Sequence, residues 1–201
     1  MIDSIISFFK RKILRDPRER WNYQYAKGQW EGLKDPIEFE RQEVCKLFFE
    51  KYKSGGSVVE IGCGEGMFVE FIMQQQGYSD YCGVDVSDLA IQNAQKLADD
   101  KTKFIIADMD NLDFGKKFDV ILYNESINYS KNIERVLKHN IQNLLNPNGI
   151  FIISVHNYKH SDEHWSDIHK VLKTIDKKTV KNARSEWNIE VLTPPSVLSK
   201  K

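Results

Sequence analysis

The sequence predicts a single α/β domain with a mostly parallel, seven-stranded sheet, helices on both faces and a C-terminal antiparallel strand pair. Short β-branched runs alternate with segments of helical periodicity over about 100 residues. A glycine-rich turn follows the first of these runs. The last two strand candidates are separated by so few residues that only an antiparallel connection can join them. The 201 residues are enough for one domain with a sizeable core.

Five strand candidates precede the C-terminal pair. Each is rich in Val, Ile or aromatic residues and ends in glycine or polar residues. They are Ser57–Ile61, Tyr81–Val86, Lys103–Ala107, Phe118–Tyr123 and Gly149–Val155. The intervening segments Asp88–Ala98 and Ile133–Leu145 carry apolar residues at helical spacing. The C-terminal pair is predicted at Thr179–Ala183 and Trp187–Leu192. Residues 1–54 are expected to form a helical cap or lid, and residues 55–201 the main domain.

The N-terminal segment has an apolar stripe that favours an amphipathic helix. Its members are Ile2, Ile5, Ile6, Phe9 and Ile13, and basic residues follow them. The stripe is too short for a spanning helix and has the wrong charge order for a secretory signal, so no stable membrane insertion is expected. Packing on the protein's own domain or on a partner, weak contact of residues 1–15 with a membrane surface, and a frayed end stay open.

Charge and cysteine content limit the function classes. Lys+Arg and Asp+Glu both number 29, so the net charge is zero. Proteins that bind long nucleic acids usually have a basic face, and this balance does not indicate one. The three cysteines have no metal-ligand spacing, which favours a reducing, cytoplasmic location. His156, His160 and His164 recur every fourth residue, but the polar tract between them reads as a loop. No metal site is therefore expected.

The chemistry begins at the glycine-rich turn. Glu60, Gly62, Gly64 and Gly66 alternate where the first strand meets a helix. Glycines permit a tight turn and let the backbone approach a ligand closely. Ligands of a doubly wound sheet bind at the carboxyl ends of its strands, where this turn lies. A simple tight turn is the alternative.

Two acidic residues end the next strands. Asp85 closes the second strand, where a carboxylate can accept both hydroxyls of a ribose. It could instead cap the following helix, since Ser87 beside it is also a capping residue type. Asp108 follows the third strand and could hydrogen-bond an adenine amino group, while the neighbouring Met109 packs on the ring.

These motifs, taken in order, resemble those of class I, Rossmann-like S-adenosylmethionine-dependent methyltransferases. The resemblance covers about residues 55 to 193 and rests on five ordered motifs. They are Glu60-x-Gly62-x-Gly64-x-Gly66, Gly83-x-Asp85, Ala107-Asp108-Met109, Phe118-Asp119-Val120-Ile121 and Leu145-Asn146-Pro147-Asn148-Gly149. Trp21-x-x-x-Tyr25-x-x-Gly28-x-Trp30 and Trp187-x-Ile189-x-Val191-Leu192 also resemble a bacterial subgroup of small methyltransferases linked to glycan, capsule and secondary-metabolite pathways.

The resemblance implies S-adenosylmethionine as the cofactor and S-adenosylhomocysteine as the product. It assigns the methionine part to Glu60, Gly62, Cys63 and Gly64, and the ribose to Asp85. Val86, Asp108 and Met109 would contact the adenine. Asn124 would offer its backbone carbonyl to the cofactor's amino group. Tyr25 and Trp30 would form a lid over the methionine end, with plain aromatic packing as the alternative.

An alcohol acceptor also requires a base. The candidates follow the fourth and fifth strands: His156, Glu125 and Tyr129. His156 titrates near neutral pH, whereas Glu125 needs burial to raise its pKa and Tyr129 is better suited to packing. A plain hydrogen-bonded loop histidine is the alternative for His156. Asn124-Glu125-Ser126 does not resemble the Asn/Asp-Pro-Pro-aromatic loop that methyltransferases acting on amides and on adenine amino groups share at this position. Methylation of nucleic-acid bases is therefore disfavoured.

The predicted function is transfer of a methyl group to an oxygen or nitrogen of a small molecule, with a sugar or glycan precursor as the expected acceptor. A cofactor-binding partner subunit without activity and a nicotinamide-dependent oxidoreductase are the alternatives. The sequence leaves open both a monomer and a homodimer.

Overall fold

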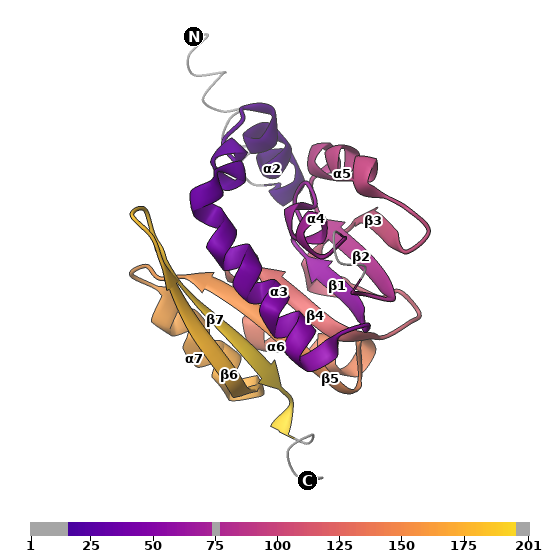
Figure 1. The fold of residues 1–201 in the computed structure, drawn as a ribbon, viewed down its shortest axis with the longest axis vertical. Helices are drawn as coiled ribbons and strands as arrows, with labels where there is room; N and C mark the ends of the chain where they lie inside the picture. The colour runs from indigo at the N-terminus through magenta and orange to yellow at the C-terminus, as the bar shows by residue number, and fades with distance from the viewer. Residues whose placement is uncertain (1–15, 74–76, 196–201) are drawn as a thin grey trace.

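The computed structural model describes residues 16–73 and 77–195 (Figure 1). Its seven strands form one sheet in the order β3-β2-β1-β4-β5-β7-β6. The strands are β1 (Ser57–Ile61), β2 (Asp80–Asp85), β3 (Thr102–Ile106), β4 (Phe118–Asn124), β5 (Leu145–His156), β6 (Lys173–Lys181) and β7 (Glu186–Thr193). The first strand, β1, lies in the middle of the sheet. The strand order reverses between β1 and β4, and ligands of such folds bind at this point. The predicted N-terminal amphipathic helix, with its suggested membrane contact, falls on residues 1–15, which lie outside the described residues.

The direction of the strands confirms the predicted architecture. β1 pairs in parallel with β2 and β4, and the outer pairs β2–β3 and β4–β5 are also parallel. β7 is antiparallel to both β5 and β6. The sheet is therefore mostly parallel and ends in an antiparallel pair.

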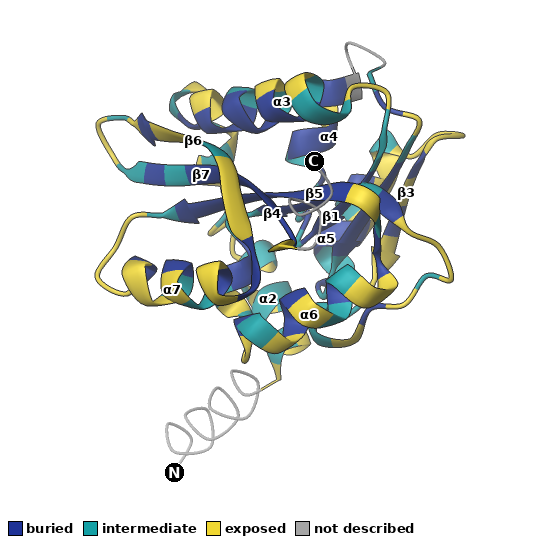
Figure 2. Ribbon diagram, turned by 90° about the horizontal axis from the view of Figure 1, so that it is seen from below, coloured by how far each residue is buried: buried dark blue, intermediate teal, exposed yellow. Residues whose placement is uncertain are grey.

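Helices cover both faces of the sheet (Figure 2). α3 (Phe39–Lys53), α4 (Met67–Met73) and α5 (Asp88–Ala94) pack on one face, and α6 (Ile133–Asn143) and α7 (Ser161–Val171) on the other. Phe49 and Phe68 fill the first layer, and Ile121 and Leu137 the second. Strands covered on both faces are mainly apolar, which is why the central strands are rich in Val, Ile and aromatic residues.

α2 (Pro17–Ala26) begins the described chain beside α5 (Figure 1). Asp16 caps it by accepting a hydrogen bond from the Arg18 amide, and Pro17 occupies the first turn, where no amide partner is needed. No residue of α2 is buried. The short turns η1 (Glu31–Lys34) and η2 (Pro36–Glu38) lead into α3, whose apolar face belongs to the sheet's core.

The remaining short turns are η3 (Gln95–Leu97), η4 (Met109–Asn111) and η5 (Ile127–Tyr129). The helix predicted at Asp88–Ala98 is thus α5 continued by η3, and the helix predicted at Ile133–Leu145 is α6. Within the described ranges, no helix has the length and apolar character that crossing a membrane requires.

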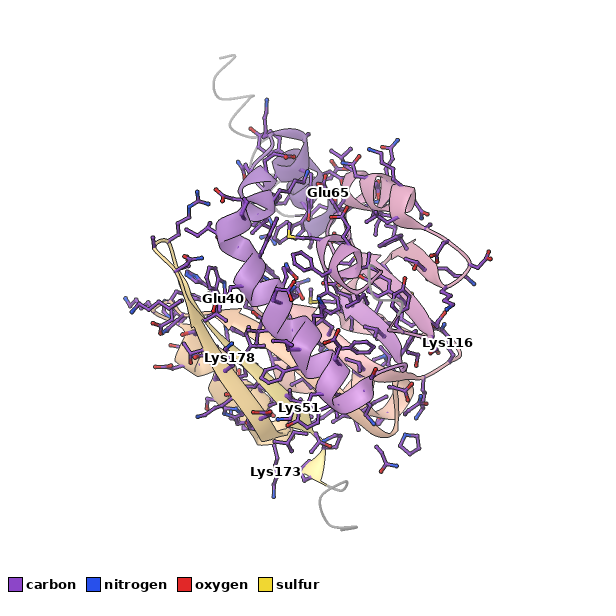
Figure 3. All side chains as sticks on the ribbon, viewed as in Figure 1. Glu40, Lys51, Glu65, Lys116, Lys173 and Lys178 are labelled. Atoms are coloured by element: carbon purple, nitrogen blue, oxygen red, sulfur yellow. The ribbon has the colours of Figure 1, made fainter. Side chains whose placement is uncertain are left out.

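The position predicted for the sixth strand was wrong. The prediction, Thr179–Ala183, includes only the last residues of Lys173–Lys181. β6 is the edge strand, and of its residues only Val180 is buried. It therefore lacks the alternating apolar pattern from which strands are recognised. Lys173 and Lys178 project from this edge (Figure 3) and discourage pairing with another sheet.

The fifth strand is longer than predicted. Gly149–Val155 was expected, but β5 extends from Leu145 to His156. The pairing with β4 shifts register near its start, and Asn148 has a φ of 68° there. The Asn-Pro-Asn-Gly stretch, which looks like a turn in the sequence, is thus an irregularity within the strand.

Candidate active site

A cavity of about 1310 Å³ opens at the carboxyl ends of the parallel strands, beneath α2 and η1. All of the predicted site residues line it. They are Tyr25, Trp30, Glu60, Gly62, Cys63, Gly64, Asp85, Val86, Asp108, Met109, Asn124, Glu125, Tyr129 and His156. The structure therefore brings together residues that are spread from Tyr25 to His156, although the role of each stays a prediction.

The glycine-rich turn folds back against β2. The amides of Gly62 and Cys63 both donate to the carbonyl oxygen of Val84, at 2.7 and 2.9 Å. Gly62 has a φ of 81°, and a β-carbon there would lie 2.3 Å from the Cβ of Ser126. Only glycine fits this position, because both the backbone conformation and the space exclude a side chain. The Cys63 thiol packs into the core beside Gly83, which leaves the backbone of the turn toward the cavity.

Asp85 supports this turn with its carboxylate. Its Oδ2 accepts a hydrogen bond from the Gly64 amide at 3.0 Å, and its Oδ1 accepts one from the Ser87 amide at 2.8 Å. The cap of α5 is Ser87, whose hydroxyl accepts from the Ala90 amide, so the helix-capping alternative for Asp85 was wrong. Desolvation raises the pKa of Asp85 above its ordinary value, although the amides act against this.

Glu60 lies under the turn and is 2% exposed. Tyr81 donates a hydrogen bond from its hydroxyl to Glu60 Oε2. Burial raises the pKa of Glu60 to about 8, while Tyr81 and the positive charge of Arg41 act to lower it.

Arg41 is the main site residue that the sequence reasoning missed. It lies on α3, is 3% exposed, and donates from Nη1 to the side-chain oxygen of Asn124. Its guanidinium carbon is 5.6 Å from the ring centroid of Trp187. Its Nε is buried without a hydrogen-bond partner, and it forms no ion pair with any carboxylate of residues 16–73 or 77–195. An arginine on the apolar face of a helix, three residues before Val44, was the available signal.

The Asn124 side chain is committed to α3. Its oxygen accepts from Arg41, and its Nδ2 donates to Gln42 Oε1 at 2.7 Å. Gln42 in turn contacts the sulfur of Met67 at 3.4 Å. This chain of contacts holds the end of β4 against α3 and leaves the backbone of Asn124 for the predicted cofactor contact.

Two residues fasten α2 to the start of α5. Asn22 Oδ1 accepts from the Ser87 hydroxyl at 2.7 Å and from the Leu89 amide at 3.4 Å. Arg18 forms an ion pair with Asp88 at 2.5 Å. Because both partners lie just past Asp85, α2 is held over the cavity by the turn that carries the predicted ribose ligand.

The lid predicted at Tyr25 and Trp30 covers the glycine-rich turn. A β-carbon on Gly64 would lie 2.7 Å from the Tyr25 hydroxyl oxygen, and the rings of Tyr25 and Trp30 are 6.3 Å apart. Burial raises the pKa of Tyr25 far above its usual range, so the hydroxyl stays protonated. Lys34 of η1 also reaches Glu65 of the turn at 2.7 Å, on the side of the molecule where α2 lies (Figure 3).

Aromatic rings line the end of the cavity beyond β4 and β5. Trp21 of α2 meets Tyr129 edge to face, with centroids 4.7 Å apart. The His156 ring stacks on Tyr158 at 6.1 Å and lies 5.8 Å from Trp187. This end is therefore suited to a ring or another flat apolar group.

Glu125 lies in the same wall in a strained conformation. Its φ of 66° is unusual for a residue with a side chain. Ser154 Oγ donates to its Oε1 at 2.7 Å, and the His156 amide donates to its Oε2 at 3.0 Å. Desolvation raises its pKa, with Arg41 acting to lower it. Such strain is frequent at functional sites.

The three histidines at four-residue spacing belong to different elements. His156 ends β5, His160 precedes α7, and His164 lies within α7, where its Nδ1 is 3.1 Å from the Tyr158 hydroxyl. In the part of the chain that the structure describes, no three His, Cys, Asp or Glu side chains are grouped as metal ligands would be.

Comparison with known proteins places this site in a family. The family model described as "Methyltransferase domain" matches residues 52–192. Malonyl-[acyl-carrier protein] O-methyltransferase 2 of Ilyobacter polytropus is 26% identical over 65% of this chain and 49% of its own length. (S)-tetrahydroprotoberberine N-methyltransferase of Eschscholzia californica is 31% identical over 51% of this chain and 31% of its own. The chain thus spans half or less of these curated relatives.

Solved structures share the fold. N-methyltransferase NodS from Bradyrhizobium japonicum WM9, in complex with S-adenosylhomocysteine, aligns with a TM-score of 0.70 at 15% identity, covering 92% of this chain and 97% of its own. The 1,6-didemethyltoxoflavin-N1-methyltransferase of Burkholderia thailandensis aligns with a TM-score of 0.72 at 16% identity, covering 93% and 89%. With the family match over most of the chain, these findings show that it belongs to the class I methyltransferases, whose cofactor is S-adenosylmethionine.

Proposed function

We propose that this protein transfers a methyl group from S-adenosylmethionine to an oxygen or nitrogen of a small molecule. The observation that carries the proposal is the cradle formed by the glycine-rich turn, Asp85 and Arg41 in one wall of the cavity. These groups match the chemistry of a nucleoside joined to an amino acid. The family match favours this function over a nicotinamide-dependent oxidoreductase.

The amino-acid end of the cofactor fits beside Arg41. A carboxylate there would satisfy the buried Nε that has no other partner. The cofactor's amino group would meet Glu60 and the backbone carbonyl of Asn124. Gly62 and Gly64 let Ser126 and Tyr25 pack directly against the turn, because a side chain at either position would meet one of them.

The nucleoside end fits along β2 and β3. Asp85 would accept the ribose hydroxyls with the lone pairs that its amide partners leave free. Val86, Asp108 and Met109 would contact the adenine. Asp108 is exposed at the cavity rim and accepts from the Asp110 amide, so its side chain is held in place by η4. Tyr25 and Trp30 would exclude water from the sulfonium side.

When bound, the cofactor supplies an electrophilic methyl group that needs no covalent help from the protein. The chain's residues must orient the acceptor and, for a hydroxyl or ammonium acceptor, remove a proton. We assign proton removal to Glu125, whose raised pKa suits a base and whose carboxylate is held by Ser154 and His156. His156, Glu125's neighbour, is the second candidate, and Tyr129 is assigned to acceptor packing.

The names of the relatives agree with acceptors at oxygen and at nitrogen. The sugar or glycan-precursor acceptor stays a prediction. So does the alternative of a cofactor-binding subunit that needs another protein for activity, because a cofactor site alone does not separate the two.

Calorimetric titration with S-adenosylhomocysteine tests the proposal, with NAD and NADP as controls. We expect micromolar binding of S-adenosylhomocysteine and no heat from either dinucleotide. Binding of a dinucleotide alone, or of none of the three ligands, would contradict the cofactor assignment. Methyl transfer from labelled cofactor to a panel of small molecules would then separate an enzyme from a non-catalytic subunit.

A further inference from the structure

We propose that Arg20 of α2 binds an acidic group of the methyl acceptor, and that the acceptor is a ring compound carrying a carboxylate. This inference rests on the proposed function and names the acceptor class of the same cavity. Arg20 lines the cavity at its aromatic end. Its buried Nε–H donates to no partner, and Arg20 forms no ion pair among the described residues.

The orientation of α2 explains why Arg20 differs from its neighbours. Pro17, Arg20, Trp21 and Tyr25 follow helical spacing and face the cavity. Arg18 and Asn22, on the adjacent side, are used to attach the helix to α5.

The other described cations of α2 and of its C-cap are engaged elsewhere. Arg18 is paired with Asp88, and Lys27 lies 5.9 Å from the ring centroid of Tyr23, which is exposed. Arg20 is thus the cation of α2 that is directed to the ligand.

The Arg20 guanidinium lies beside an aromatic ring. Its central carbon is 5.3 Å from the Trp21 ring centroid, and Trp21 packs edge to face on Tyr129. A guanidinium is a flat fork that can bind a carboxylate through two parallel hydrogen bonds. The unpartnered Nε provides one arm of that fork.

The same rings specify the rest of the acceptor. Trp21 and Tyr129 form one wall, and the stacked pair His156 and Tyr158 also lines the cavity. Flat aromatic faces favour a planar ring. Glu125 lies in the same wall and would repel an acceptor whose acid was placed beside it. The acid is therefore expected at Arg20 and the reacting hydroxyl or amine toward Glu125.

The test uses two probes of the same shape, 4-hydroxybenzoate and 4-hydroxybenzamide, which differ in charge. Their affinities for protein saturated with S-adenosylhomocysteine are measured by ligand-observed NMR titration, with methyl glucoside as a neutral sugar. We expect the acid to bind at least about tenfold more tightly than the amide, because the lost contacts are charge-assisted. Arg20→Gln should abolish this difference and Arg20→Lys should retain part of it. Lys27→Gln, on the same helix but outside the cavity, should behave as the wild type.

The affinity for S-adenosylhomocysteine, measured first in each variant, distinguishes failure of the proposed function from failure of the role proposed for Arg20. Failure of the wild type to bind it would contradict the proposed function. If it binds and Arg20→Gln binds it equally well, the acceptor probes test Arg20 alone. Equal affinity for acid and amide, binding of neither, preference for the sugar, or an unchanged acid preference in Arg20→Gln would each overturn the inference.

Discussion

The hydroxyl oxygen of Tyr25 lies over Gly64, 2.7 Å from the place that a β-carbon on that glycine would occupy. Two segments that are far apart in the sequence, the lid helix and the glycine-rich turn, are thereby fitted to each other without a side chain between them. Gly64 also has a φ of 55°, which disfavours any residue with a β-carbon.

Gly64→Ala should therefore weaken S-adenosylhomocysteine binding by displacing Tyr25 and straining the turn. The strain alone costs about 1–2 kcal/mol. The Tyr25→Phe change removes the atom that the new methyl group would meet, so the double variant should recover part of the lost affinity. Calorimetry on the two single variants and the double variant gives this coupling. Strict additivity of the two losses would contradict the contact.

Asp85→Asn should reduce the affinity for S-adenosylhomocysteine by about tenfold or more, because charge-assisted hydrogen bonds are worth about 1.5–3 kcal/mol. The Asn side chain keeps an acceptor for only one of the Gly64 and Ser87 amides, so the free energy of unfolding should also fall, by about 1–3 kcal/mol. Calorimetry and urea unfolding measure the two quantities. The exposed Asp100→Asn is the control, and an unchanged affinity in Asp85→Asn would remove the ribose assignment.

Arg41→Gln should weaken binding of S-adenosylhomocysteine, with its carboxylate, by about tenfold or more. Binding of 5′-methylthioadenosine, which lacks the amino-acid part, should not change. The comparison of the two ligands isolates the carboxylate from any general damage to the site. Lys178→Gln, on the exposed edge strand β6 and away from the cavity, is the control. Equal losses for both ligands would mean that Arg41 acts only through the packing of Asn124 and Trp187.

Glu60 should make the protein less stable as the pH rises. Its folded pKa of about 8 lies above the ordinary value of 4.5, so the folded chain holds more protons than the unfolded chain between those values. Its contribution is fully present below pH 4.5 and is lost as the pH passes about 8. Glu60→Gln should remove this dependence and be the more stable protein in alkaline solution. Urea midpoints at about pH 5 and pH 9 measure it. The exposed Glu40→Gln (Figure 3) should keep the wild-type slope.

Glu125→Gln should lower kcat by about 10²–10⁴-fold if the acceptor needs a base, with little change in cofactor affinity. Because the pKa of Glu125 is raised, kcat of the wild type should increase with pH through that pKa, and the variant should lose this limb. His156→Asn should have the smaller effect on the pH profile, since Glu125 is held by the backbone amide of His156. The reverse ranking would assign the base to His156.

The sequence was sufficient for most of the sheet and for residues that line the cavity at its carboxyl edge. β1 and β4 were recognisable because strands covered on both faces consist mainly of apolar residues, as in Val58–Ile61 and Phe118–Tyr123. β6 was not, because an edge strand with one buried side chain has no apolar period. The glycines and Asp85 were recognisable because their role depends on local backbone geometry.

Arg41 and Arg20 could not be identified in this way, because their roles depend on contacts between distant segments. Arg41 meets Asn124 across 83 positions, and the lid contact of Asn22 with Ser87 crosses 65. A helix with almost no amphipathic signal, such as α2, gives no indication in the sequence of which side faces a ligand. Packing decides which of its arginines faces the cavity.

The attachment of α2 has a consequence for kinetics. One helix carries Tyr25 over the glycine-rich turn and Trp21 into the aromatic end of the cavity, and it is fastened to Ser87 and Asp88 beside the predicted ribose ligand. The proposed acceptor end of the cavity is therefore completed by an element that is held in position from the proposed cofactor end. We expect a compulsory order of addition, with the acceptor second and S-adenosylhomocysteine leaving last, so that this product competes with the methyl donor but not with the acceptor.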